Sequence, residues 1–120
     1  MTPSEIIIAD CKKNGVDPQY YLNTVAHILQ TKLGILLQKG DTVLLVIRLG
    51  DGRAELHIST ADSPIKVKSA IKYFIDKLKE SEIHTVYGSG FPADTIAVIK
   101  RFGIDVQKSN RPQYGWMANI

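Results

Sequence analysis

The chain has 120 residues, a single cysteine and a formal net charge of +3, and 44% of its residues are hydrophobic. This length and apolar content suit one domain with one core, whereas a lone cysteine excludes an internal disulfide and a thiolate metal cluster. No apolar run reaches the roughly 20 residues needed to cross a bilayer, and the first residues do not resemble a signal peptide. We therefore expect synthesis in the cytoplasm, and the charge alone does not indicate nucleic-acid binding.

Two short amphipathic helices are predicted first. A capping box at Thr2–Glu5 starts one helix, and Asn14-Gly15 ends it. Asp17-Pro18 starts a second helix, whose apolar stripe ends near Gly34. Because both helices need a surface to cover, residues 1–34 are expected to form a helical pair packed on a sheet.

Three strand-like segments follow, namely ILLQ, TVLLVIRL and RAELHIST. Turn residues around Gly40 and Gly52 separate them, so the pattern predicts an antiparallel meander. The middle segment is apolar on both faces, which suits a central strand covered on both sides. Arg53–Thr60 instead alternates apolar and polar residues, so one of its faces is available to line a cleft.

Helices and strands alternate in the remaining residues. Apolar residues at helical spacing predict a long helix up to Leu78, capped by Asp62-Ser63-Pro64, and a later helix over Ala93–Phe102. IHTVYGSG reads as a strand between them. IDVQKSN and QYGWMANI predict a closing hairpin around Arg111-Pro112. Its last strand is expected to place four residues on one face, namely Tyr114, Trp116, Ala118 and Ile120.

This order of elements resembles the GNAT family of acetyl-CoA-dependent N-acetyltransferases. The segments that carry the resemblance are RAELHIST before a helix, then IHTVYGSG, ADTIAVIKRFGIDVQ and the closing YGWMANI. The resemblance covers residues 35–120 as the core. It implies a single α/β (α+β) domain whose mixed central sheet contains an antiparallel meander and has helices on both faces. Among GNAT-like proteins, the chain looks most similar to small internal virion proteins of short-tailed (podovirus) phages.

The resemblance also identifies a candidate cofactor turn. In the family, backbone N–H groups of the turn after the cofactor strand hold the CoA pyrophosphate, and two small residues let the backbone come close. The corresponding residues here are Ser63, Lys66, Lys68 and Ser69, with lysine at both small-residue positions. Long side chains hinder that approach, although lysines at a helix start can bind phosphate as point charges. We therefore expect no cofactor, or acetyl-CoA if the chain is active.

Candidate catalytic residues lie on the alternating strand. Glu55 or His57 could act as general base for an amine if its side chain faces the cleft. The alternative is that both are polar residues on an outer strand face. The resemblance places the family's acid at Ile99, which cannot donate a proton.

The main hypothesis from the sequence is a GNAT-like domain without catalysis, acting as a structural or protein-binding component of a phage virion. Its candidate partner contacts are Lys66, Lys68, Lys72 and Trp116, with Trp116 as a core residue in the other reading. One alternative is an acetyl-CoA-dependent N-acetyltransferase acting on a primary amine. A second alternative is a nucleic-acid-binding module that uses the lysine-rich face of the long helix.

No metal site is predicted, because the three histidines lie far apart in the sequence and no cysteine or carboxylate stands at metal spacing. Cys11 is expected to be a buried structural thiol.

Overall fold

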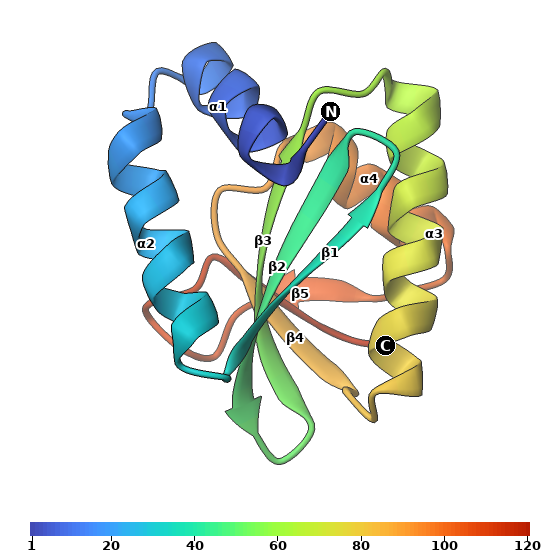
Figure 1. The fold of residues 1–120 in the computed structure, drawn as a ribbon. Coiled ribbons are helices and arrows are strands. Elements are labelled where there is room, and N and C mark those ends of the chain that lie inside the picture. Colours follow the sequence, from blue (N-terminus) through green and yellow to red (C-terminus); the bar gives the residue numbers. More distant parts are fainter.

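Four helices and six strands make up the chain, described over residues 1–120 by a computed structural model (Figure 1). The helices are α1 (Pro3–Asn14), α2 (Pro18–Gln30), α3 (Pro64–Glu80) and α4 (Ala93–Arg101). The strands are β1 (Gly34–Lys39), β2 (Thr42–Gly50), β3 (Arg53–Thr60), β4 (Thr85–Gly88), β5 (Val106–Lys108) and β6 (Trp116–Asn119). They form one mixed sheet in the order β1-β2-β3-β4-β6-β5. Only β3 and β4 pair in parallel, so the predicted meander and mixed sheet are confirmed.

The N-terminal helix begins as its sequence predicts. The Glu5 N–H donates to Thr2 Oγ1 at 3.2 Å, and the Thr2 N–H donates to Glu5 Oε1 at 2.8 Å, which completes the capping box. Gly15 adopts φ 70° and ends the helix, because only glycine reaches that conformation without strain. None of the four helices combines the length and apolarity needed to cross a membrane.

The start of α3 differs from the prediction. Ser63 stands at the N-cap position, but its side chain makes no capping hydrogen bond. Asp62 does not cap the helix either, because its Oδ2 accepts from the Asp41 N–H and the Thr42 hydroxyl, both at 2.9 Å. The prediction that Asp62-Ser63 caps α3 is therefore wrong, because neither side chain bonds to the helix start. The Asp62 carboxylate instead links the end of β3 to the start of β2.

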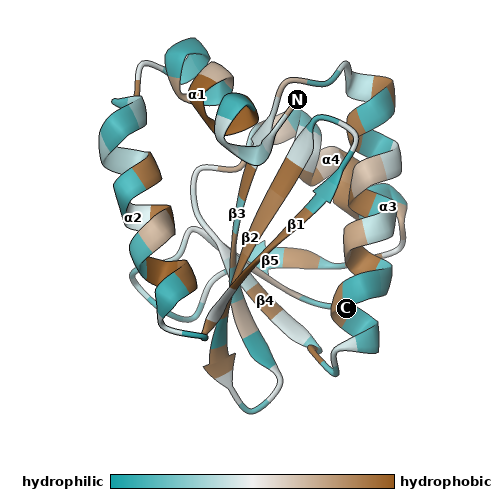
Figure 2. Cartoon of the chain, in the orientation of Figure 1, coloured by the Kyte–Doolittle hydropathy of each residue, from teal (hydrophilic) through white to brown (hydrophobic).

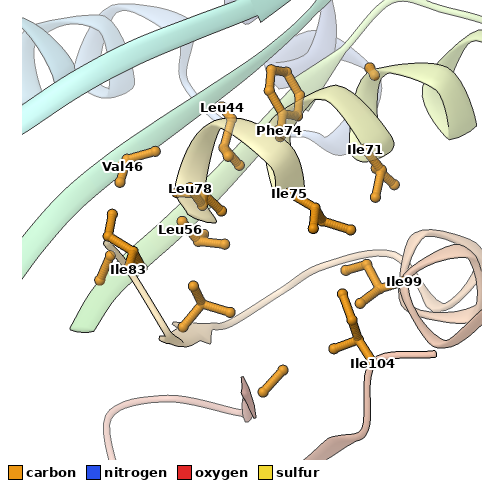
Figure 3. Close-up of a cluster of buried hydrophobic side chains, with 14 of the residues drawn as sticks. Leu44, Val46, Leu56, Ile71, Phe74, Ile75, Leu78, Ile83, Ile99 and Ile104 are labelled. Carbon is orange, nitrogen blue, oxygen red and sulfur yellow. The ribbon is translucent and has the colours of Figure 1, made fainter. Parts of the chain in front are cut away.

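The sheet separates two apolar clusters, because β2 is buried on both faces. Leu44 and Val46 join a cluster of 16 buried residues beneath α3 and α4 (Figure 3). Val43 and Leu45 join a second cluster of 6 buried residues beneath α1 and α2. Figure 2 shows brown apolar stripes on the helices, including those over this central strand. The prediction of a central strand with helices on both faces is confirmed.

The last strand corrects one prediction about side-chain direction. Trp116 and Ala118 point into the α3-side core, but Tyr114 lies before β6 begins and bonds to Glu55 on the opposite face. The side-chain alternation of β6 does not extend back to Tyr114, because backbone bonding to β4 begins only at Gly115, whose N–H donates to the Gly88 carbonyl at 3.0 Å.

Trp116 packs directly against the backbone of β4. A methyl group added to Gly88 would lie 2.5 Å from the Trp116 ring, and Phe91 covers the same ring edge-on with centroids 5.0 Å apart. A small cavity of about 40 Å³ lies beside these rings and is lined only by apolar side chains. The end of β4 thus requires glycine at position 88, because the Trp116 indole ring lies where a side chain would be.

We predict that Gly88→Ala lowers the free energy of unfolding by about 1–3 kcal/mol, because the added methyl overpacks the Trp116 ring. Urea unfolding followed by Trp116 fluorescence measures the change. Gly115→Ala is the matched control, since its methyl would lie 3.8 Å from the nearest atom and its φ is not positive. Equal stability of Gly88→Ala and the wild type would contradict the prediction.

Candidate active site

The parallel strands β3 and β4 separate at one end. Their last paired residues are Leu56 and Gly88, and no backbone hydrogen bond joins β3 to the residues that follow Gly88. Strand β3 continues to Thr60, whereas the chain after β4 turns towards α4. The strand gap, as we call the space between Leu56–Thr60 and Gly88–Phe91, therefore opens the sheet where α1 crosses the end of β3 (Figure 1).

On the α1 face, the strand gap widens into a hollow of about 270 Å³, which we call the α1-side hollow. One wall comes from the end of α1, the turn after it and the start of α2, through Asp10, Cys11, Asn14, Val16 and Tyr21. The other walls are His57, Ile58 and Ser59 of β3, and Ser89, Gly90 and Phe91 after β4. His57 therefore faces a cleft, which was the condition for its predicted role.

A hydrogen-bonded chain of three side chains ends at this hollow. The Tyr114 hydroxyl donates to Glu55 Oε1 at 2.6 Å, and Glu55 Oε2 contacts His57 Nε2. The His57 side chain is 34% exposed and that of Glu55 is 22% exposed. An ionised carboxylate can only accept, so in the neutral form of His57 the proton is on Nε2 and the lone pair is on Nδ1. Glu55 thus fixes the tautomer in which His57 can accept a proton at Nδ1.

Tyr114 remains a donor over the physiological pH range. Burial is the main cause that raises the pKa of Tyr114 to about 12, and the hydrogen bond to Glu55 acts in the same direction. Its ring stacks on Tyr87 with centroids 5.1 Å apart, and the Arg111 guanidinium lies 5.2 Å from the Tyr87 ring centre. Tyr114 could not be predicted as a partner of Glu55 from the sequence, because the turn before β6 brings the two together.

A second hollow of about 270 Å³, the α3-side hollow, lies where α3 and α4 begin. Asp10 and Asn14 line both hollows, so the two meet at the C-terminal end of α1. Three carboxylates, of Asp10, Asp62 and Asp94, line the α3-side hollow, and Lys13 is its one basic side chain. The side of the strand gap next to α3 is therefore acidic.

One backbone amide at the strand gap already has a partner from α1. The Thr60 N–H donates to Asp10 Oδ1 at 3.2 Å, whereas the Ala61 N–H donates to Asp41 O at 2.9 Å. Amides alternate along a strand, so those of Ile58 and Thr60 point away from β2 and into the strand gap. The Asp10 carboxylate therefore bonds to the Thr60 amide, whereas the Ile58 amide on the same strand edge has no such partner.

The predicted cofactor residues do not gather at the strand gap. Lys66 and Ser69 line a third hollow beside Gly40 and Asp41, which shares only Asp62 with the α3-side hollow, and Lys68 is exposed and lines neither hollow of the gap. Ser63 lies at the start of α3 without a side-chain bond.

The other residues singled out in the sequence lie away from the strand gap or in the core. Lys72 pairs with Asp76 at 2.8 Å on the exposed face of α3. Trp116 is only 8% exposed, which places it in the core and away from the surface that a partner could reach. Cys11 is buried, as expected. No group of three or more histidine, cysteine or acidic side chains is arranged to hold a metal ion.

Several solved acetyltransferases have a similar arrangement of helices and strands. A GNAT acetyltransferase from Staphylococcus aureus matches 96% of this chain and 89% of its own, with a TM-score of 0.59 at 18% identity. The match to the IAA acetyltransferase from Bacillus cereus covers 98% of this chain and 89% of that protein, with a TM-score of 0.58 at 12% identity. The fold is that of the GNAT acetyltransferases. A Bacillus subtilis acetyltransferase in complex with CoA matches 81% of this chain and 80% of its own, with a TM-score of 0.53 at 14% identity.

No protein-family model matches the sequence, and no curated protein matches it either. At these identities the GNAT neighbours establish the fold alone.

The residues at the strand gap fit CoA only in part. The open edge at Ile58 suits an extended arm that contains amides, because such an arm can pair with a strand. A diphosphate is disfavoured in the hollow at the start of α3, since the carboxylates of Asp10, Asp62 and Asp94 line it together with a single lysine, Lys13.

We predict that Glu55→Gln lowers the pKa of Tyr114 from about 12. The neutral amide no longer opposes formation of the phenolate, whereas burial still keeps the pKa above its usual value of about 10. Titration of the Tyr114 ring carbon by NMR measures the shift, with Tyr114→Phe assigning the signal. Glu80→Gln, on the exposed end of α3, serves as the matched control. An unchanged Tyr114 pKa in Glu55→Gln would show that the hydrogen bond is absent in solution.

Proposed function

We propose that this chain transfers an acyl group from a thioester to a primary amine, with His57 as the general base. The observation that carries the proposal is the Tyr114–Glu55–His57 chain, which ends in a hollow at the gap between two parallel strands of a GNAT fold. An orienting carboxylate, a histidine and an adjoining cavity are the elements that general-base catalysis requires.

His57 does the proton transfer in this scheme. The amine nitrogen attacks the thioester carbonyl, its bond to carbon forms, and Nδ1 of His57 accepts the proton that the nitrogen loses. Glu55 holds the ring through Nε2–H and stabilises the imidazolium that results. Tyr114 positions Glu55 and does not touch the substrate.

The acceptor binds in the α1-side hollow. Its polar wall, formed by Asp10, Tyr21 and Ser59, can hold a small amine beside His57. Ile99, which the resemblance places at the acid position, is buried and apolar. Water therefore protonates the leaving thiolate.

A second candidate is a GNAT-like binding domain without catalysis. The acidic α3-side hollow favours this candidate, because it opposes a CoA diphosphate. In that case a protein partner would cover the strand gap. The neighbours reported above are acetyltransferases, so they lend no support to a virion role.

We predict that His57→Gln lowers kcat for amine-dependent acetyl transfer by about 10²–10⁴-fold, because the general base is lost. Release of free thiol, measured over a panel of small primary amines, reports the rate. His27→Gln is the matched control, since His27 lies exposed on α2, away from the strand gap. Background release with every amine would remove the catalytic proposal and favour the binding domain.

A further inference from the structure

The two hollows at the strand gap differ in what they can bind. The α1-side hollow contains the proposed base His57, whereas the α3-side hollow presents the carboxylates of Asp10, Asp62 and Asp94. Each of these carboxylates accepts a backbone N–H, from Thr60, Asp41 and Thr95 respectively. They are therefore held in place, and an anion that entered from this side would meet fixed negative charge.

Basic side chains do not compensate for this charge. Lys13 is the one basic residue that lines the α3-side hollow. Lys66 lines the adjoining hollow beside Gly40 and Asp41, which shares Asp62 with the α3-side hollow, and Lys68 lines neither. A diphosphate in the α3-side hollow would therefore meet three carboxylates and only one lining lysine, fewer cationic partners than such groups usually have.

The strand edge suits an uncharged arm. The Ile58 amide points into the strand gap without a strand to pair with, because β4 ends opposite Leu56. A chain that carries amides can bond to this edge and pass from the α3-side hollow towards His57. The next amide, of Thr60, is already bound to Asp10, so the edge offers room for a short arm.

We propose that the acyl donor of this protein is a thioester on a neutral, amide-containing arm without a diphosphate, and that acetyl-CoA is a poor donor. The inference rests on the proposed N-acyl transfer. The bond between the acyl carbon and sulfur breaks as the bond to the amine nitrogen forms. The amine proton goes to His57 and then to solvent, and the thiolate takes a proton from water.

The test compares acetyl-pantetheine with acetyl-CoA as donors to the same primary amine. We expect kcat/KM for acetyl-pantetheine to equal or exceed that for acetyl-CoA. A preference for acetyl-CoA of tenfold or more would overturn the inference, because the diphosphate would then contribute to binding.

Charge variants test the cause of the preference. Asp94→Asn should raise the ratio of the acetyl-CoA rate to the acetyl-pantetheine rate about threefold or more, since one opposing charge is removed. Asp51→Asn is the matched control, because Asp51 lies on the exposed turn between β2 and β3 and should leave the ratio unchanged. An unchanged ratio in Asp94→Asn would contradict the electrostatic argument.

Binding separates this inference from the proposed function. Acetyl-pantetheine is expected to shift the Ile58 amide signal in an NMR titration, with an affinity at least equal to that of acetyl-CoA. If this order holds but no donor gives amine-dependent thiol release, the transferase proposal fails and the ligand inference stands. If neither molecule shifts the Ile58 signal, or if acetyl-CoA binds tenfold tighter, the ligand inference is wrong.

Discussion

The parting of β3 and β4 after Leu56 and Gly88 is the constraint on which the rest of the structure depends. Two parallel strands that stay paired leave no room between them, whereas strands that part expose an edge and open a path through the sheet. Trp116 packs against Gly88, the last residue of β4, and the Gly115 N–H donates to the Gly88 carbonyl. The core therefore determines where the sheet opens, and the site forms at that opening.

The opening combines two kinds of electrostatic surroundings within one small region. On one side, Glu55 orients His57 towards a hollow with polar walls. On the other side, carboxylates fixed by backbone N–H groups surround the start of α3, where an anion would otherwise be favoured by the helix dipole. The scaffold resembles that of the acetyltransferases in its strands, whereas three carboxylates line the hollow at the start of α3. Fold and chemistry are thus set by separate residues, as is common for widely used folds.

Part of the site could be predicted from the sequence. Glu55 and His57 lie two residues apart on an alternating strand, so they share a face, and this face proves to be the one at the strand gap. The lysines of the candidate cofactor turn could not be placed in the same way. Successive side chains of a helix point about 100° further around its axis, and Lys66 and Lys68 consequently do not face the α3-side hollow that Pro64 and Val67 line.

Elements and their ends follow from local interactions, which the residues themselves specify. The capping box at Thr2–Glu5, the period of β3 and the two apolar faces of β2 all appear in the structure as the sequence indicates. The partners of Glu55 and Thr60 do not follow in this way. Tyr114 lies 59 residues from Glu55, and Asp10 lies 50 residues from Thr60. Such contacts depend on how strands and loops come together in space, which no local periodicity encodes.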